Sequence, residues 1–311
     1  MESLAVGVFG AGHFGRFHAL KLRGAARARL AGLHDPDPAR AALVSGETGC
    51  VAFPAGALLA ACDAVIIATP TLYHARLAEM ALRAGKHVFV EKPITATLAE
   101  ADALIALAAV TGRVLMVGQI ERHSAAIQTL RESLGGRSLV ALEATRIAPF
   151  RPRSLDVSVV LDLMIHDLDL IISLVAAPLT EVRAVGGSVM TKLPDWAVAQ
   201  LRFADGTQAQ VTASRVAVGL ERKFRALGPE GEMRIDFLAR SLEYLAPDGE
   251  TPVEHMPGWG LTRRSWTDHD SLQAEQSAFI AAILDGAPHE ADGTQGRAAL
   301  DAALRIEAAL C

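Results

Sequence analysis

The sequence predicts an α/β fold in two domains, a doubly wound parallel sheet followed by an α+β domain with a mainly antiparallel, open sheet. Three observations carry this prediction. Short apolar runs alternate with helical patterns over the first 120 residues. From residue 138 onward, strand-like runs follow one another through short turns. A glycine-rich turn joins the first apolar run to the first helical pattern. We expect the domains at residues 1–120 and 121–311.

The first apolar run, Leu4 to Phe9, leads directly into the glycine-rich turn. Gly10, Gly12 and Gly15 follow in the spacing G-x-G-x-x-G, and a helical pattern continues to Gly24. The first glycine permits a tight turn, the second lets a pyrophosphate approach the backbone, and the third lets the helix pack on the strand. The helix N-terminus offers free N–H groups to phosphates. The N-terminal domain is therefore predicted to be a dinucleotide-binding Rossmann domain.

A second apolar run ends at Asp35, which stands 20 residues after Gly15. An acid at this point holds the ribose hydroxyls of the adenosine and repels a 2′-phosphate, which favours NAD over NADP. Arg40 is close enough in sequence to weaken that preference. An ordinary turn followed by an ordinary acidic loop is the alternative interpretation.

Polar residues follow each predicted strand of the N-terminal domain at its carboxyl end. Ligands of parallel sheets bind at these ends. We therefore predict that the cofactor-binding residues are Gly10, Gly12, His13, Phe14, Gly15, Asp35, Arg40, Thr69, Pro70, His74, Glu91, Lys92 and Gln119. A capping box at Thr97 and Glu100 begins a helix between two of these strands.

The composition excludes several classes of protein. A net charge of −5 gives no reason to expect a nucleic-acid partner. Three cysteines are too few for a disulfide framework or a zinc site, and they fit a reducing, cytoplasmic compartment. The most apolar stretch, residues 161–179, is interrupted by aspartates and a histidine, so no membrane span is predicted.

Two further features are candidates for chemistry. Pro93 restricts Lys92 to an extended conformation, which aims its side chain. In a long helix predicted over residues 157–175, Asp162 and His166 share one face of an apolar, buried segment. Buried acids and histidines need partners or a cavity, so a satisfied core network and a catalytic pair both remain open. A metal site with Asp169 would lack a second ligand cluster, and no metal is predicted.

These motifs resemble the Gfo/Idh/MocA family of NAD(P)-dependent sugar oxidoreductases, and the resemblance covers the whole chain. It rests on the glycine-rich turn, Ala68-Thr69-Pro70 with His74, Glu91-Lys92-Pro93, and Asp162-x-x-x-His166. The resemblance implies that Lys92 and His166 are catalytic, that Asp162 assists them, and that Glu91-Lys92-Pro93 contacts the nicotinamide ribose and the reacting hydroxyl. It also implies a homodimer or homotetramer formed through the C-terminal sheet.

One departure from the family pattern is visible. Many members have glycine within the Asp-x-x-x-His segment, where this chain has Leu163-Met164-Ile165. Either the helix starts earlier than usual or the substrate sits differently.

Second-domain stretches at residues 117–122, 146–153 and 160–167 resemble a bacterial subgroup that includes UDP-N-acetylglucosamine 3-dehydrogenases of lipid A biosynthesis. This implies a UDP-linked amino sugar oxidised at carbon 3. Arginine suits bidentate phosphate contacts, and several arginines precede the helix of His166. The predicted substrate-binding residues are Lys92, Arg122, Arg146, Phe150, Arg153, Asp162 and His166.

Other interpretations remain open. The arginines could equally belong to a solvent-exposed loop or form salt bridges across an oligomer interface. A free sugar or an inositol-like cyclitol is an alternative substrate. Reduction of an unsaturated or imine substrate on the same scaffold is an alternative reaction. A dinucleotide-binding sensor without turnover is a further alternative, although the presence of Lys92, Asp162 and His166 together argues against it.

Overall fold

A computed structural model describes residues 3–152, 157–247, 249–267, 269–289 and 291–310. The chain divides into unit 1, Met1–Ile120 with Asp270–Leu300, and unit 2, Glu121–His269 with Asp301–Cys311. Residues 270–300 thus belong with the first unit, whereas the sequence suggested the second domain. The order of elements along the chain does not reveal that residues 270–300 join unit 1, because this depends on which core their helices pack against.

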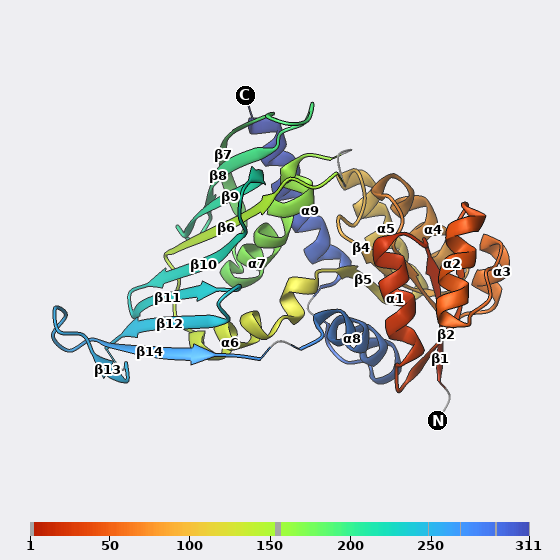
Figure 1. Ribbon diagram of the computed structural model, residues 1–311, viewed down its shortest axis with the longest axis horizontal. Coiled ribbons are helices and arrows are strands. Elements are labelled where there is room, and N and C mark those ends of the chain that lie inside the picture. Colours follow the sequence, from red (N-terminus) through yellow and green to blue (C-terminus); the bar gives the residue numbers. More distant parts are fainter. Residues whose placement is uncertain (1–2, 153–156, 248, 268, 290, 311) are drawn as a thin grey trace. The chain divides into compact units, whose positions relative to one another are not determined.

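Unit 1 is built on a parallel sheet, as predicted (Figure 1). The sheet has five strands in the order β2-β1-β3-β4-β5. The strands are β1 (Leu4–Phe9), β2 (Ala28–His34), β3 (Ala64–Ile67), β4 (His87–Glu91) and β5 (Leu115–Gly118). They are apolar because both faces of such a sheet are covered. β2 and β3 lie on opposite sides of β1, so the direction of strand addition reverses at β1. Ligands bind at this kind of switch point.

Helices cover the sheet of unit 1. They are α1 (His13–Arg23), α2 (Pro38–Thr48), α3 (Ala55–Ala60), the 3-10 turn η1 (Thr71–Tyr73), α4 (His74–Arg83), α5 (Leu98–Thr111), α8 (Ser271–Asp285) and the first part of α9 (Gly293–Ala309). The capping box is confirmed: the Thr97 hydroxyl accepts the Glu100 N–H, and the Glu100 carboxylate accepts the Thr97 N–H. Among the described residues, no helix is both long and apolar enough to cross a membrane.

Unit 2 contains a nine-stranded sheet in the order β13-β14-β12-β11-β10-β6-β9-β8-β7. Its strands are β6 (Ala141–Pro149), β7 (Leu179–Gly187), β8 (Trp196–Phe203), β9 (Gln208–Ala217), β10 (Glu221–Gly228), β11 (Gly231–Asp236), β12 (Ser241–Ala246), β13 (Thr251–Pro252) and β14 (Gly260–Ser265). All the pairs are antiparallel except β6 with β9. The predicted mainly antiparallel sheet is confirmed, as is the hairpin at Asp205-Gly206, where Gly206 has a φ of 92°.

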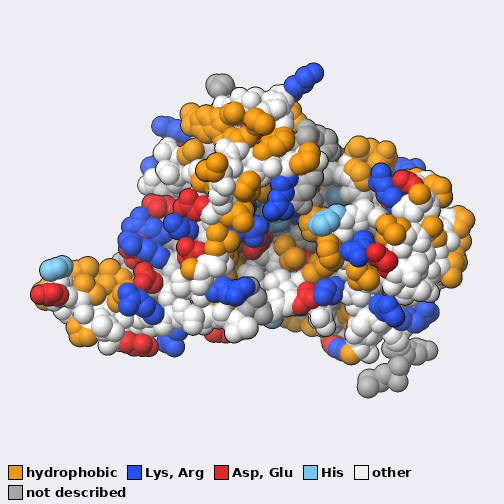
Figure 2. Space-filling model, viewed as in Figure 1, with side chains coloured by type: hydrophobic (Ala, Val, Ile, Leu, Met, Phe, Trp, Pro, Cys, Tyr) orange, Lys and Arg blue, Asp and Glu red, His pale blue; other side chains and the backbone are white. Residues whose placement is uncertain are grey.

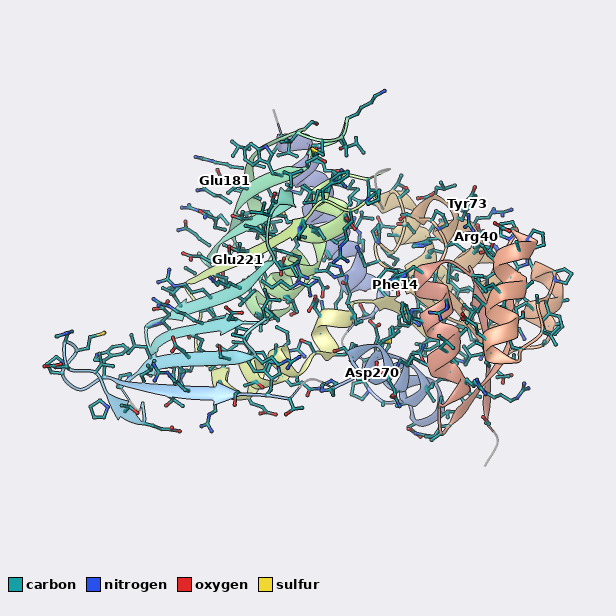
Figure 3. All side chains as sticks on the ribbon, viewed as in Figure 1. Phe14, Arg40, Tyr73, Glu181, Glu221 and Asp270 are labelled. Carbon is teal, nitrogen blue, oxygen red and sulfur yellow. The ribbon has the colours of Figure 1, made fainter. Side chains whose placement is uncertain are left out.

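One face of this sheet packs on α6 (Ala125–Leu134) and α7 (Ile165–Val175). Inward residues of β8 such as Ala199 and Leu201 are buried, whereas the residues between them are largely exposed. The opposite face carries projecting polar side chains, among them Glu181 and Glu221 (Figure 3). This alternation is typical of an antiparallel sheet covered on one side.

Candidate functional site

The three glycines after β1 meet different surroundings. Gly10 has a φ of 97°, and a Cβ there would lie 2.5 Å from the carbonyl oxygen of Ala68. A Cβ on Gly15 would lie 1.9 Å from the carbonyl oxygen of Gly10. A Cβ on Gly12 would have no atom within 4 Å among the described residues. The first and third glycines are thus required by the turn and the packing, while the second faces open space.

The start of α1 fits the pyrophosphate of a dinucleotide. Gly12 occupies the N-cap position and brings no side chain to the first amide N–H groups. These groups and the helix dipole attract anions. His13 and Phe14 are exposed in the first turn. Figure 3 labels Phe14.

Asp35 follows β2 and joins the glycine-rich turn to the next helix. Its carboxylate accepts the N–H of Ala11 at 2.6 Å and that of Asp37 at 2.8 Å. Each carboxylate oxygen has a second lone pair, so the group retains the capacity to accept ribose hydroxyls. Arg40 is exposed on α2, and its guanidinium lies 3.1 Å from the carboxylate of Asp37.

His74 is buried and contacts two loops. It is 1% exposed, its Nδ1 lies 2.8 Å from the Pro93 carbonyl oxygen, and its Nε2 lies 2.9 Å from that of Thr69. Burial lowers the pKa of His74, against the opposing effect of the two carbonyls. His74 therefore joins the loop after β3, which contains Pro70, to the loop after β4. Both ring nitrogens face backbone carbonyl oxygens, and a role of His74 in binding the cofactor stays a prediction.

Lys92 lies directly after β4, at the same edge of the sheet as the glycine-rich turn, and is half-buried. Glu91 pairs with Gly118 on β5, and Gln119 follows with 2% exposure. The Glu91 carboxylate contacts His18, a residue that the sequence analysis missed. The available signal was a histidine within the buried stripe of α1, where it needs a polar partner.

In unit 2, Asp162 and His166 lie at a break in helical geometry. Val160–Met164 form a π-helical turn, η3, and α7 begins at Ile165. The prediction of one regular helix over residues 157–175 is wrong in this turn, because π-type hydrogen bonds add a residue to it. Both side chains are half-buried within a largely buried segment. Such turns are frequent at functional sites.

Two of the predicted substrate-binding arginines are instead buried in ion pairs. The guanidinium of Arg122 binds both carboxylate oxygens of Asp169, at 2.6 and 2.7 Å. The guanidinium of Arg146 binds Asp167 at 2.8 and 2.9 Å, and also Glu121 at 2.8 Å. Each arginine is 3% exposed. The expectation that they bind a diphosphate is corrected, because carboxylates distant in sequence already occupy them.

A cation that the sequence analysis did not select lies beside this network. Arg222 on β10 stands opposite Arg146 on β6, so both face the helix-covered side. The Arg222 side chain is 44% exposed, and its guanidinium lies 3.8 Å from the carboxylate of Glu121. Burial and the positive charges of Arg146 and Arg151 lower the pKa of Arg222. Three arginines and the carboxylates of Glu121 and Asp167 therefore lie together where β6 ends and β10 begins.

The remaining predicted residues of this region are Phe150 and Arg153. Phe150 is half-buried immediately after β6. Arg153 lies outside the described residues. Elsewhere on the visible surface, charges of both signs are interspersed over the strands of unit 2 (Figure 2).

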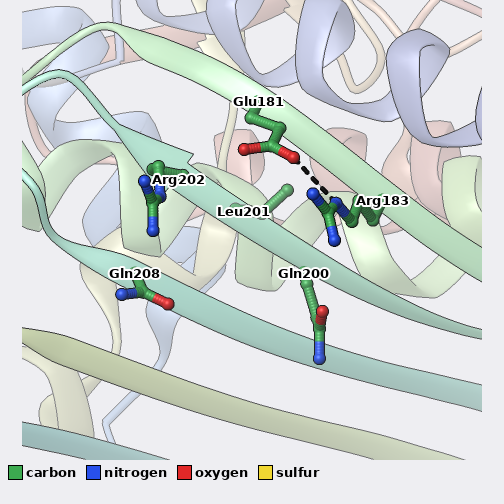
Figure 4. A pocket seen from close by; sticks show the side chains of 6 residues that line it. All are labelled: Glu181, Arg183, Gln200, Leu201, Arg202 and Gln208. Carbon is green, nitrogen blue, oxygen red and sulfur yellow. Dashed lines mark hydrogen bonds and ion pairs between the residues drawn. The ribbon is translucent and has the colours of Figure 1, made fainter.

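A shallow pocket of about 150 Å³ lies on the outer face of β7, β8 and β9 (Figure 4). It is lined by Glu181, Arg183, Gln200, Leu201, Arg202 and Gln208. Glu181 and Arg183 form an ion pair at 2.7 Å within it. None of the predicted site residues lines this pocket. Within the described ranges, no group of three histidine, cysteine or acidic side chains is arranged to hold a metal.

Comparison with known families gives two matches. The model described as "Oxidoreductase family, NAD-binding Rossmann fold" matches residues 4–119. The model described as "GFO/IDH/MocA C-terminal domain" matches residues 138–234.

Individual relatives match over nearly the whole chain. UDP-N-acetylglucosamine 3-dehydrogenase of Acidithiobacillus ferrooxidans is 43% identical over 311 residues, which cover 100% of this chain and 98% of that protein. A solved structure of that enzyme has a TM-score of 0.94, with 42% identity and coverage of 100% and 98% of the two chains. Inositol 2-dehydrogenase of Rhizobium meliloti is 32% identical, covering 96% of this chain and 95% of that protein.

Proposed function

This chain belongs to the Gfo/Idh/MocA family of NAD-binding oxidoreductases, and we propose that it oxidises UDP-N-acetylglucosamine at carbon 3 to the 3-keto sugar. The observation that carries the proposal is the full-length similarity, 43% identity, to an enzyme named for this reaction. The glycine-rich turn, the open N-terminus of α1 and Asp35 support NAD as the cofactor.

The catalytic roles follow from side-chain chemistry. His166 is the base that takes the hydroxyl proton, since an imidazole titrates near neutral pH. Lys92 stabilises the developing alkoxide with its ammonium group. Asp162 orients this pair and balances its charge. NAD, when bound, supplies the acceptor for the hydride that leaves carbon 3.

The diphosphate is assigned to the exposed cations beside β6 and β10. With Arg122 and Arg146 buried, Arg222 and Arg151 are the arginines that the described structure offers for this role. A planar guanidinium suits bidentate phosphate contacts. Phe150, half-buried nearby in sequence, offers an apolar surface for uracil or the sugar.

A free cyclitol is the second candidate substrate. Two observations favour it: the 32% identity to an inositol 2-dehydrogenase and the burial of two arginines that had supported a diphosphate. Because a sensor without turnover would show no activity on either compound, one assay separates all three possibilities.

The test is steady-state NADH formation with UDP-N-acetylglucosamine, N-acetylglucosamine and myo-inositol. We expect turnover with the nucleotide sugar and at least 100-fold lower kcat/KM with the other two, on the order of the binding energy of charged contacts. Activity confined to an unphosphorylated compound would overturn the substrate assignment. Arg222→Ala should raise KM about ten-fold with little change in kcat, since a remote contact binds substrate and transition state alike.

Arg234→Ala is a matched control for this variant. Arg234 is an exposed arginine on the neighbouring strand β11, paired with Glu232. Its removal should leave KM unchanged. An equal effect of both substitutions would point to the general charge of the sheet and not to a diphosphate contact.

The proposed reaction also indicates a cellular compartment and a pathway. A nucleotide-sugar substrate and few cysteines fit a cytoplasmic enzyme, with lipid A biosynthesis as the consuming pathway. Self-association through the outer face of the unit 2 sheet fits its exposed apolar residues, including Val185 and Trp196.

A further inference from the structure

A buried histidine contacts the residue that precedes Lys92. His18 on α1 has 0% exposure, and its Nε2 lies 2.8 Å from Oε1 of Glu91. The imidazole also packs edge-on against Phe89 of β4, with 5.3 Å between ring centroids. The end of β4 is therefore held from the side of α1 by one polar and one aromatic contact.

Gln276 on α8 and Glu91 on β4 together determine which nitrogen of His18 carries the proton. The Gln276 side-chain nitrogen lies 2.8 Å from Nδ1 of His18 and 3.2 Å from the His18 carbonyl oxygen. Only the amide nitrogen can face a backbone carbonyl, so this contact fixes the orientation of the amide. The second amide hydrogen then points to Nδ1, which must accept it. His18 is thus the neutral tautomer whose Nε2–H donates to Glu91.

The Glu91 carboxylate has little room to move. Glu91 pairs with Gly118 of β5, and a Cβ on Gly118 would lie 2.9 Å from Oε2 of Glu91. The Glu91 side chain is 13% exposed. One carboxylate oxygen therefore lies in space that a side chain at position 118 would fill, and the other contacts His18.

The residue after Lys92 is held as well. Nδ1 of His74 lies 2.8 Å from the carbonyl oxygen of Pro93. Lys92 therefore has, on each side along the chain, a neighbour fixed by a buried histidine. A lysine side chain loses much rotamer entropy when it is held in one orientation. A rigid backbone at residue 92 reduces the further entropy that must be lost to place the ammonium group.

We propose that His18 is a positioning residue for Lys92: as the Nε2–H tautomer, it holds Glu91 and thereby fixes the backbone from which Lys92 reaches the reacting hydroxyl. This inference rests on the proposed function, in which Lys92 acts on the substrate.

Two substitutions of His18 separate positioning from packing. His18→Gln retains an N–H donor toward Glu91, whereas His18→Phe retains the ring and loses the donor. In His18→Phe we expect kcat to fall about 10- to 100-fold, with the KM for NAD changed less than about three-fold. His18→Gln should remain within about three-fold of the wild type in kcat. Equal losses in both variants, or normal kcat in His18→Phe, would overturn the proposal.

Phe279→Leu is the matched control. Phe279 lies on α8 and packs on Phe89 with 5.7 Å between ring centroids, so the change loosens the same core without touching the polar contacts. Its kcat should be unchanged. If His18→Phe does not fold, Gln276→Met replaces it, since this change keeps His18 but removes the donor that holds Nδ1 and orients the ring. Gln276→Met should then lower kcat while Phe279→Leu does not.

Two measurements do not depend on turnover. Nitrogen-15 NMR of the full-length wild type should show His18 protonated at Nε2 and unprotonated at Nδ1, and the opposite tautomer or an imidazolium would overturn the proposal. Amide hydrogen exchange over residues 88–95 should be faster in His18→Phe and unchanged in His18→Gln. Unchanged exchange in His18→Phe would count against positioning.

The two proposals fail in distinguishable ways. Loss of turnover in Lys92→Met with normal turnover in His18→Phe would remove the positioning role and leave the proposed function intact. If the wild type oxidises none of the three candidate substrates, the proposed function fails, while NMR and hydrogen exchange still decide the role of His18.

Discussion

At the scale of single residues, Lys92 and His166 carry the proposed chemistry. Lys92→Met and His166→Asn should each lower kcat by two or more orders of magnitude, the usual size of acid–base and electrostatic effects. His166→Asn should change the NAD dissociation constant little, because His166 belongs to unit 2 and the glycine-rich turn to unit 1. Single-turnover kinetics and calorimetric titration with NAD provide the two measurements.

Thr97→Ser serves as a control for these variants, since it keeps the helix cap on α5 with the same hydrogen-bonding group. Its kcat should equal that of the wild type. Near-normal turnover in Lys92→Met or His166→Asn would show that the substituted residue has a structural and not a catalytic role.

The choice of dinucleotide is also a property of one residue. Asp35→Ser removes the carboxylate that repels a 2′-phosphate, so the preference for NAD over NADP should fall at least ten-fold. The loss of the contact to the Ala11 N–H at 2.6 Å should weaken binding of both cofactors. Dissociation constants for NAD and NADP measured by calorimetry separate the two effects, and an unchanged ratio would contradict the assignment.

At the scale of elements, local signals were predictable and distant partners were not. The strand β1, the glycine-rich turn and the capping box at Thr97 depend on neighbours in sequence, and the sequence predicted all of them. The helix α6 was missed, although Ser124 caps its start and Gly135 ends it with a φ of 54°. Those two signals sufficed to find it.

The arginines show what a sequence cannot indicate. Arg146 and its partner Asp167 are 21 residues apart, and Arg122 and Asp169 are 47 apart. An exposed, ligand-binding arginine and a buried, paired one have the same appearance in a sequence. The π-helical turn at Asp162 is a similar case, because the pattern of apolar residues does not distinguish it from a regular helix.

The start of the segment that carries Asp162 is anchored by a buried acid. The Asp195 carboxylate accepts the N–H groups of residues 189–191 and the Arg215 Nε–H at 2.9 Å, and Arg215 donates to the Val157 carbonyl at 2.9 Å. Burial would raise the pKa of Asp195, but these donors outweigh it and lower the pKa well below its usual range. Asp195 therefore stabilises unit 2 above the ordinary carboxyl pKa, and this contribution is lost as the pH falls below it.

Asp195→Asn should accordingly destabilise unit 2 by about 3–5 kcal/mol at pH 7.5, the usual cost of breaking a buried pair. The difference from the wild type should shrink as the pH is lowered from about 4 to 3. Urea unfolding followed by tryptophan fluorescence reports on unit 2, since Trp196, Trp259 and Trp266 all lie there. Glu254→Gln, an exposed acid, is the control. A difference independent of pH would contradict the assigned role of the charge.

At the scale of the whole molecule, the chain passes between its units three times. It enters unit 2 after Ile120, returns at Asp270, and enters unit 2 again within α9 after Leu300. The sequence predicted the first of these crossings, because the alternation of strands and helices ends there. The other passages depend on which core α8 and α9 join, and both helices have apolar residues suited to either.

The last prediction concerns self-association. β7 is the edge strand of the unit 2 sheet, and its outer face is polar at the pocket of Glu181 and apolar where Val185 pairs with Val198. Val185 is 60% exposed. An exposed apolar area beside a free edge favours contact with a second copy, and a two-fold contact would place the same patch on both partners.

On the proposed self-association, the wild type should sediment as an oligomer and Val185→Glu as a 32.8 kDa monomer, because a two-fold contact would bring the two new carboxylates together. Sedimentation velocity at micromolar concentration measures the change. Val110→Glu is the matched control, since Val110 is 85% exposed on α5 of unit 1. It should sediment like the wild type. An oligomer that survives Val185→Glu, or one that Val110→Glu disrupts, would place the interface on another surface.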